Sequence, residues 1–409
     1  MDQDLPIVID GFGSDIHGES ARLRERGPVA QVEVPGGLAA WSVTGYWAAR
    51  HVLADERFSK DARLHWPAYA EGTISEDFPL LNWARMDNMS TAHGEVHARQ
   101  RRLVAGAFSA QRVAALQPRI EQLVAGVLDT LAERAANAPD GVVDLKTEYA
   151  HSVASLVIGE LLGVRPEDRD DVLGRAGYVP ANQQEMRAEF LRHQKAVTAL
   201  VAVKHREPGE DLISDLIAAQ AAAGPSSDEE VVSLVLLMLN TGTEPAKNLI
   251  VNAVLALLTR PDQRELVREG QISWDDVIEE TLRVDAPVAM MPFRYAVEDV
   301  TVEGERIAQG CPVLVSFAAP GRDPDLHGAD AAEFDARRTD KRHLAFGYGA
   351  HRCVGQALAR MEVRIAVQAL FARFPDLALA VAADDLAPQP TFIMNGRGSL
   401  PVRLSAASS

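Results

Sequence analysis

The segment HLAFGYGAHRCVG, residues 343–355, is the most informative part of this 409-residue chain. Its glycines at 347, 349 and 355 permit tight backbone turns and a close approach to a flat partner. Cys353 stands just before a predicted helix, where unpaired backbone N–H groups and the helix dipole favour the thiolate over the thiol. Such a thiolate can be a nucleophile or a metal ligand. The other cysteine, Cys311, lacks these surroundings and is expected to be an inert packing residue.

Helical hydrophobic patterns fill most of the chain around this loop. Ser109 is a candidate N-cap for a long amphipathic helix, and a last helix is predicted at 356–374. Residues 231–258 are apolar almost all round, which is typical of a helix running through the middle of a protein. The other predicted helices cover residues 113–136, 144–162 and 183–205, and a segment from Ser273 that ends by Pro287.

Short β-strands are predicted at two places. Residues 28–34 and 39–43, joined by a Pro-Gly-Gly turn, have the pattern of a β-hairpin. Alternating residues at 300–303 and 312–317 predict two further short strands. We therefore predict a mainly α fold with small β-sheets.

The chain contains no linker, internal repeat or low-complexity block, so we predict one large domain over residues 1–409. Residues 64–92 carry several aromatic and Met side chains but show neither a helical nor a strand period. A long apolar segment without a period is either a poorly predicted element or a lid over a binding site. We favour a substrate-access lid.

The charge of the chain excludes two classes of partner. With 41 Lys and Arg against 58 Asp and Glu, the formal charge is −17, which disfavours general binding to nucleic acid or anionic membranes. The first residues lack the pattern of a signal peptide, and the longest apolar stretch, 231–239, is shorter than the ~20 residues of a membrane span. Only two cysteines are present, which suits a reducing compartment. We expect a cytoplasmic protein.

Residues 346–355 resemble the haem-binding loop of the cytochrome P-450 superfamily, whose pattern is Phe-Gly-x-Gly-x-His-x-Cys-x-Gly. All six fixed positions match. The resemblance implies a single triangular fold around a buried haem b, with Phe346 in the cofactor loop and Cys353 as the iron ligand. A thiolate ligand pushes electron density onto iron and favours O–O cleavage. The implied function is that of a bacterial haem-thiolate monooxygenase of the ferredoxin-dependent type.

A second segment carries the same resemblance. Glu280 and Arg283 match the Glu-x-x-Arg element of the family, and their spacing places both charges on one helical face. Taken alone, such a pair is also typical of an exposed helix. The family joins a downstream arginine to the pair, and Arg338 is the matching residue. Residues 322–324 fit the family as well, although Gly321 stands where asparagine is common.

Haem carries two propionates, so its site needs cations and hydrogen-bond donors from several elements. The resemblance implies that His97, Arg101, Arg294 and His351 hold these propionates. An alternative is a zinc site, because His93 and His97 are four residues apart. In the zinc hydrolase motif, however, a glutamate follows the first histidine directly, whereas here Gly94 intervenes.

The predicted central helix departs from the family at one position. The family has a small residue, Gly, any residue, an acid and Thr, where acid and alcohol relay protons to dioxygen. Gly242 and Glu244 match, but Pro245 replaces the threonine, so a kink is expected and residue 245 supplies no hydroxyl. Thr241, Thr243, a substrate hydroxyl or an ordered water could replace this alcohol, which is the interpretation that we favour.

Two other consequences of Pro245 stay open. The enzyme could use peroxide, or perform oxidative coupling or desaturation, reactions in which this proton delivery is unimportant. The chain could also be a haem protein that binds a ligand without turnover. A tolerated kink without any consequence is the simplest alternative.

The resemblance further implies a small to medium apolar substrate of secondary metabolism. Each of the matching pocket positions could equally be plain core packing. The candidate substrate-binding residues are Met89, Leu239, Asn240, Thr243, Val288, Met290, Met291, Phe392 and Ile393.

Electrons must come from separate partners, because 409 residues leave no room for a flavin or iron–sulfur module beside the haem domain. The resemblance implies a ferredoxin and an NAD(P)H-dependent ferredoxin reductase. A basic patch near the thiolate is the predicted docking surface on this acidic protein. Its candidate residues are Arg99, Arg101, Arg102, Lys341, Arg342, Arg352 and Arg360.

Overall fold

The computed structural model describes residues 6–174, 183–223 and 227–404. Their contacts divide the chain into two compact units, which are described separately below. Unit 1 comprises residues 1–98, 255–353 and 387–398, and unit 2 comprises residues 99–254, 354–386 and 399–409. The prediction of a single domain over the whole chain stays a prediction.

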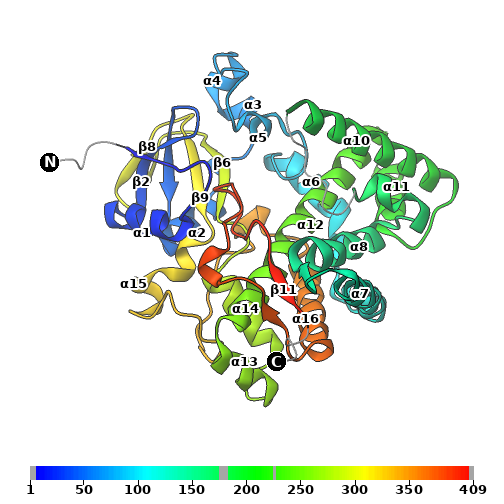
Figure 1. Cartoon of the computed structure of the whole chain (residues 1–409). Helices are drawn as coiled ribbons and strands as arrows, with labels where there is room; N and C mark the ends of the chain where they lie inside the picture. The colour runs from blue at the N-terminus through cyan, green and yellow to red at the C-terminus, as the bar shows by residue number, and fades with distance from the viewer. Residues whose placement is uncertain (1–5, 175–182, 224–226, 405–409) are drawn as a thin grey trace. The chain divides into compact units, whose positions relative to one another are not determined.

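Unit 1 is built on a six-stranded sheet with the order β1-β2-β3-β9-β6-β4 (Figure 1). The predicted hairpin is confirmed, since β2 and β3 are antiparallel and Val34 lies opposite Leu38. Helix α1 packs on β2 and helix α2 packs on β9. The strands are β1 (Ile7–Val8), β2 (Val29–Val34), β3 (Leu38–Val43), β4 (Phe58–Ser59), β6 (Met290–Ala296) and β9 (Pro312–Ser316), and β7 (Val300–Val302) pairs with β8 (Glu305–Ile307) in a second sheet.

The alternation of side chains along β9 explains why both faces of this sheet are buried. Val313 and Val315 belong to a cluster that includes the apolar face of α2, whereas Leu314 points into a second cluster. Successive side chains of a strand point to opposite faces, so an unbroken apolar strand requires a cover on each side.

The helices of unit 1 are mostly short. The predicted helix from Ser273 is confirmed as α14 (Trp274–Val284), where the Ser273 side chain accepts a hydrogen bond from the Asp276 N–H at 3.1 Å in a capping box. The others are α1 (Ile16–Arg26), α2 (Tyr46–Ala54), α3 (Ala62–His65), α4 (Pro67–Ala70), α5 (Leu81–Arg85), α13 (Pro261–Arg268) and α15 (Pro324–His327), with 3₁₀ turns at Ala319–Arg322 and Gly349–His351.

The segment proposed as a lid, residues 64–92, consists of short helices joined by coil and is packed against the sheet. Trp66 is 2% exposed and stacks on Tyr295 with ring centroids 5.3 Å apart. Phe78 and Leu81 are buried in the same cluster. In the conformation described, this segment therefore covers part of the core of unit 1, and any opening must break these contacts.

Unit 2 is predominantly helical, and α7 packs on both α8 and α16 (Figure 1). The Tyr149 hydroxyl donates to the Ala366 carbonyl at 2.7 Å and so ties the segment before α8 to α16. The elements are α7 (Ala110–Asn137), α8 (His151–Leu162), α9 (Arg169–Val172), α10 (Gln183–Arg206), α11 (Leu212–Ala223) and α16 (Gln356–Arg373), with 3₁₀ turns at Gly106–Phe108, Pro166–Asp168 and Ala383–Asp385 and a three-stranded sheet of β10 (Ala378–Leu379), β11 (Pro401–Arg403) and β5 (Val142–Asp144).

Two helices span the boundary between the units along the chain, α6 (Gly94–Ala105) and α12 (Asp228–Leu258). The predicted central helix is confirmed as α12, which continues without a break through Pro245. The predicted helix at 144–162 is only partly correct. Its first residues form the end of β5 and a π-helical turn, Lys146–Ala150, before α8 begins.

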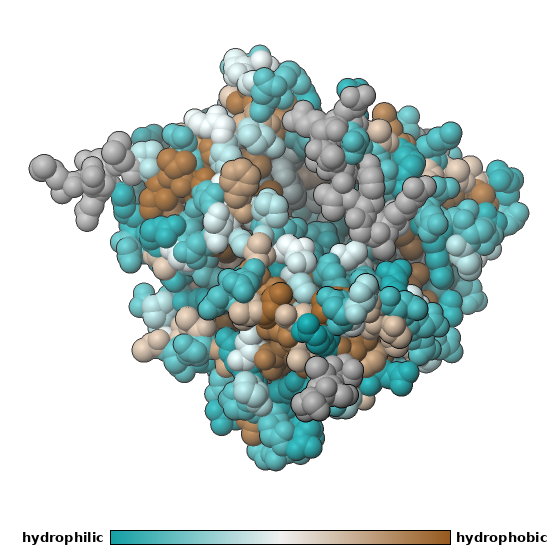
Figure 2. All heavy atoms as spheres, in the orientation of Figure 1, coloured by the Kyte–Doolittle hydropathy of each residue, from teal (hydrophilic) through white to brown (hydrophobic). Residues whose placement is uncertain are grey.

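In the described ranges, none of the helices is both long and apolar enough for a membrane span. On the face shown in Figure 2, hydrophilic side chains predominate and apolar ones are scattered.

Candidate active site

The backbone of the cysteine loop explains its glycines. Gly349 has φ 72°, and a Cβ atom there would lie 2.4 Å from the Leu53 carbonyl oxygen of α2. The loop is closed by a hydrogen bond of 2.9 Å from the Cys353 N–H to the Phe346 carbonyl. Cys353 is exposed and lies three residues before α16 begins. The loop therefore leaves Cys353 accessible, just before the N-terminal end of a helix.

Helix α2 supports this loop from one side in a way that the sequence analysis missed. The Arg50 guanidinium donates to the Tyr348 hydroxyl at 2.7 Å and lies 4.3 Å from the centre of the Tyr348 ring. The same guanidinium lies 5.3 Å from the centre of the Trp47 ring. Trp47 is 60% exposed. No spacing in the sequence indicates this contact, because the residues are about 300 positions apart.

Two of the predicted propionate-binding histidines meet in unit 1. The rings of His97 and His351 have centroids 3.9 Å apart, and His97 is 5% exposed. His93 instead pairs with His65, at 5.3 Å between ring centroids. His93 and His97, the i,i+4 pair considered for zinc, therefore each contact a different histidine. Among the described residues, no group of three or more His, Cys, Asp and Glu side chains is placed to hold a metal ion.

Arg294 follows a β-bulge in β6 and is 6% exposed, with one guanidinium N–H donating to the Phe58 carbonyl at 3.2 Å. Burial lowers the pKa of Arg294 to about 10. Half-buried Lys60 lies near it, and burial together with the Arg294 charge lowers the pKa of Lys60 to about 7. Neither side chain has a carboxylate partner in the described part of unit 1.

Two neighbouring cations without an acid are costly to bury, and a bound anion would relieve that cost. The pair therefore fits an anionic group such as a haem propionate. The sequence analysis missed Lys60, because no motif marks it. Arg101, which lies in the part of α6 that belongs to unit 2, is half-buried.

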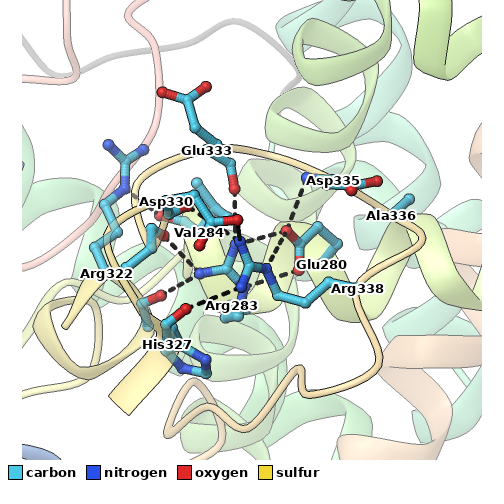
Figure 3. Close-up of polar contacts among 12 residues, drawn as sticks. Glu280, Arg283, Val284, Arg322, His327, Asp330, Glu333, Asp335, Ala336 and Arg338 are labelled. Atoms are coloured by element: carbon cyan, nitrogen blue, oxygen red, sulfur yellow. Dashed lines mark hydrogen bonds and ion pairs between the residues drawn. The ribbon is translucent and has the colours of Figure 1, made fainter. Parts of the chain in front are cut away.

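The Glu280, Arg283 and Arg338 side chains are brought together inside unit 1 (Figure 3). Arg283 Nη2 lies 2.6 Å from Glu280 Oε1, and neither side chain is exposed, so the interpretation as an exposed helix pair is wrong. Arg338 Nε lies 3.8 Å from the same carboxylate oxygen. A Cβ atom at Gly321 would lie 1.7 Å from the Arg283 carbonyl oxygen, which explains why a glycine stands there.

Pro245, where the central helix departs from the family pattern, lies in the part of α12 that belongs to unit 2. Thr241 is exposed, and its hydroxyl donates to the Leu237 carbonyl at 2.8 Å, whereas Thr243 is half-buried. The Glu244 carboxylate pairs with Lys247 Nζ at 2.6 Å. The i,i+3 spacing of Glu244 and Lys247 in the sequence is the signal that could have indicated this pair.

The candidate substrate residues fall into several environments. In unit 1, Met290, Phe392 and Ile393 belong to one apolar cluster, and Val288 belongs to another with Met291 packed against it. The remaining four candidates differ in exposure: Met89 in unit 1 and Leu239 in unit 2 are buried, whereas in unit 2 Thr243 is half-buried and Asn240 is exposed.

Among the cations proposed for partner docking, Arg99, Lys341 and Arg342 are paired with carboxylates. Arg99 pairs with Glu230 in unit 2. In unit 1, Lys341 lies 2.9 Å from Asp276. Arg342 lies 2.6 Å from Asp340. Such pairing weakens the positive potential that a docking patch requires.

Comparisons with known proteins are consistent with this geometry. Residues 178–384 match the protein family described as Cytochrome P450. The chain is 44% identical over 408 residues to 2-hydroxy-5-methyl-1-naphthoate 7-hydroxylase of Streptomyces carzinostaticus. This match covers 99% of this chain and 98% of that protein.

Two solved structures are similar over nearly the whole chain. CYP154A1 from Streptomyces coelicolor A3(2) has a TM-score of 0.86 at 44% identity and covers 97% of this chain and 100% of that one. CYP154C4 from Streptomyces sp. W2061 has a TM-score of 0.90 at 41% identity and covers 98% of both chains. These likenesses confirm the predicted mainly helical fold with small sheets.

Proposed function

Because this chain belongs to the cytochrome P450 family of haem-dependent monooxygenases, we propose that it hydroxylates an apolar ring compound of secondary metabolism. The observation that carries the proposal is the cysteine loop, which holds Cys353 exposed before α16 in a backbone that only glycines permit. A thiolate in that position is suited to bind the haem iron.

We propose that the cofactor is haem b, which when bound supplies the activation of O₂. Cys353 binds its iron, and Phe346 lies in the loop that contacts it. His97, Arg101, Arg294 and His351 hold the propionates. Lys60 joins them, since its position beside Arg294 supports a second cation at an anionic group.

Glu244, Thr241 and Thr243 are the proposed groups that hold and move protons. The Thr241 hydroxyl already donates to the Leu237 carbonyl, so its oxygen remains available mainly as an acceptor. Thr243, a substrate hydroxyl or a water is therefore better suited to replace the alcohol that Pro245 lacks. A peroxide-driven or non-hydroxylating oxidation, such as coupling or desaturation, is the second candidate, and Pro245 is the observation that favours it.

The substrate class is proposed from the relative that is 44% identical, which is named for hydroxylation of a substituted naphthoate. We propose that the apolar side chains of Val288, Met290 and Phe392 contact a fused aromatic ring compound. A titration of the purified protein with hydroxynaphthoate and with a steroid tests this class. A spectral shift of the Soret band with the naphthoate alone supports it, and a shift with the steroid alone contradicts it.

The proposed electron donors are a ferredoxin and its NAD(P)H-dependent reductase. Arg99, Lys341 and Arg342 of the predicted patch are paired with carboxylates, which weakens their contribution to docking. Ferredoxin-supported turnover is expected to fall as ionic strength rises. A rate that does not change with salt contradicts electrostatic docking.

The decisive experiment is a carbon-monoxide difference spectrum of the reduced protein, followed by turnover with a surrogate ferredoxin system and then with peroxide. A strongly red-shifted Soret band with reductase-dependent product supports the monooxygenase. Product with peroxide alone supports the second candidate. A haem-thiolate spectrum without any product supports a haem protein that binds a ligand without turnover.

A further inference from the structure

Glu244, the proposed proton-delivering acid, lies in a cluster of charged side chains within unit 2. It pairs with Lys247, about one helical turn further along α12, with Lys247 Nζ 2.6 Å from Glu244 Oε2. The Lys247 side chain is 13% exposed and that of Glu244 is 36% exposed. Partial burial strengthens an ion pair relative to the same pair in water.

A second cation, Lys146 in the π-helical turn before α8, interacts electrostatically with this pair. Lys146 is 8% exposed, and burial followed by the Lys247 charge lowers the pKa of Lys146 to about 8. Glu244 and Asp144 oppose that decrease, so both carboxylates act electrostatically on Lys146. Lys146 thus shares one electrostatic environment with the Glu244–Lys247 pair.

The third member is His151, the first residue of α8. Burial and then the Lys247 charge lower the pKa of His151, and Glu244 opposes them. Its Nε2 lies 3.4 Å from the Ser155 hydroxyl. His151 therefore responds to both charges of the ion pair.

Helix α12 also approaches α8 closely at Gly242, two residues before Glu244. A Cβ atom at Gly242 would lie 2.9 Å from Ile158 Cδ1, so the two helices approach closely at the turn that contains Glu244. Pro245, in that same turn, has neither a backbone N–H nor a hydroxyl with which to orient the neighbouring carboxylate.

We propose that Lys247 is a positioning residue for proton delivery, which holds the Glu244 carboxylate in one orientation. The Lys247 ammonium on α12 thereby performs part of the positioning role that a hydroxyl at position 245 would perform. The inference rests on the proposed monooxygenase function and adds to it one residue, Lys247, and the reason for its charge.

The first test is the coupling of NAD(P)H consumption to product. In Lys247→Met the Glu244 carboxylate loses its Lys247 partner, so product per NAD(P)H is expected to fall roughly tenfold while peroxide release rises. Lys247→Arg keeps the charge and should restore most of the coupling. A matched control is Arg268→Met, because Glu265 and Arg268 form an exposed pair with the same i,i+3 spacing in α13.

The second test uses His151 as a reporter and needs no turnover. In the reduced, carbon-monoxide-bound holoenzyme, NMR of labelled histidine measures the His151 pKa, with His151→Gln to assign the signal. Removing a positive charge in Lys247→Met should raise this pKa, and removing a negative charge in Glu244→Gln should lower it. The other charged groups that act on the cluster, Lys146 and Asp144, are unchanged in both variants.

The outcomes separate the inference from the proposed function. Unchanged coupling in Lys247→Met, in an enzyme whose wild type forms product, overturns the positioning role alone. An unchanged His151 pKa in both variants contradicts the electrostatic interaction of His151 with Glu244 and Lys247. A wild type without a thiolate spectrum overturns the monooxygenase proposal, whereas the His151 titration of the haem-containing protein still tests the cluster.

Discussion

The Arg283 guanidinium binds the Glu280 carboxylate twice, at 2.6 and 2.8 Å, in the interior of unit 1. Its other N–H groups donate to the carbonyls of Gly321 at 2.5 Å, Ala331 at 2.6 Å and Glu333 at 2.8 Å. All five donors of the guanidinium are therefore used. The arginine ties the coil at 321–333 to α14, and this coil leads into the cysteine loop along the chain.

We expect Arg283→Lys to destabilise the protein strongly, because a lysine cannot reproduce five donors in a planar arrangement. Leaving the Glu280 carboxylate poorly paired should cost about 3–5 kcal/mol in the free energy of unfolding. Denaturant unfolding of the variant measures this loss. Arg337→Lys is the control, since Arg337 pairs with Asp335 at the surface and should change stability little. Equal stability of both variants would contradict a structural role for Arg283.

Cys353→Ser should abolish the red-shifted band in the carbon-monoxide difference spectrum, because a hydroxyl does not supply a thiolate to iron. Cys311→Ser provides a control in the same unit and should leave the band unchanged. A band that survives in Cys353→Ser removes Cys353 as the ligand.

Lys60→Met should accelerate haem loss, since the proposed propionate site would keep only Arg294 at that position. The expected effect is a dissociation rate higher by roughly tenfold, equivalent to about 1.4 kcal/mol, measured by transfer of haem to an excess of a haem-binding protein. Arg57→Met is the control, because Arg57 forms an exposed pair with Asp55. If both variants release haem at the wild-type rate, Lys60 does not bind the cofactor.

Pro245→Thr should raise product per NAD(P)H by roughly twofold or more if the absent alcohol limits proton delivery. The change also restores the N–H that the Thr241 carbonyl lacks in α12. The control is Pro118→Thr, which replaces the proline inside α7. Unchanged coupling in Pro245→Thr would show that the substrate, a water or another side chain already does this work.

Trp66→Ala tests the segment predicted to be a lid. Trp66 stacks on Tyr295 and also contacts Phe293, with ring centroids 6.0 Å apart, so its loss should cost about 3–5 kcal/mol. Faster amide hydrogen exchange confined to residues 64–92 is expected if this segment opens as a unit. Trp47→Ala removes an exposed tryptophan and is the control. Exchange that rises equally throughout unit 1 would contradict a separate lid.

Local signals in the sequence predicted most of the regular elements. The hairpin at 28–43, the helix from Ser273 and the long apolar helix at 231–258 all follow from patterns within a single segment. The segment at 144–162 was mispredicted at its start because helical period alone does not separate a strand end or a π-turn from an α-helix.

The sequence by itself determined the family, because the pattern around Cys353 and the Glu280–Arg283 pair each lie within a short stretch of the sequence. Only the tertiary structure decided which distant residues join them. Lys60 beside Arg294, Arg50 on Tyr348 and Lys146 beside the Glu244–Lys247 pair come from elements far apart in the chain. Their contacts depend on how the helices and strands pack against one another. The identity of a charged or aromatic residue in the sequence does not indicate which distant residue it will contact.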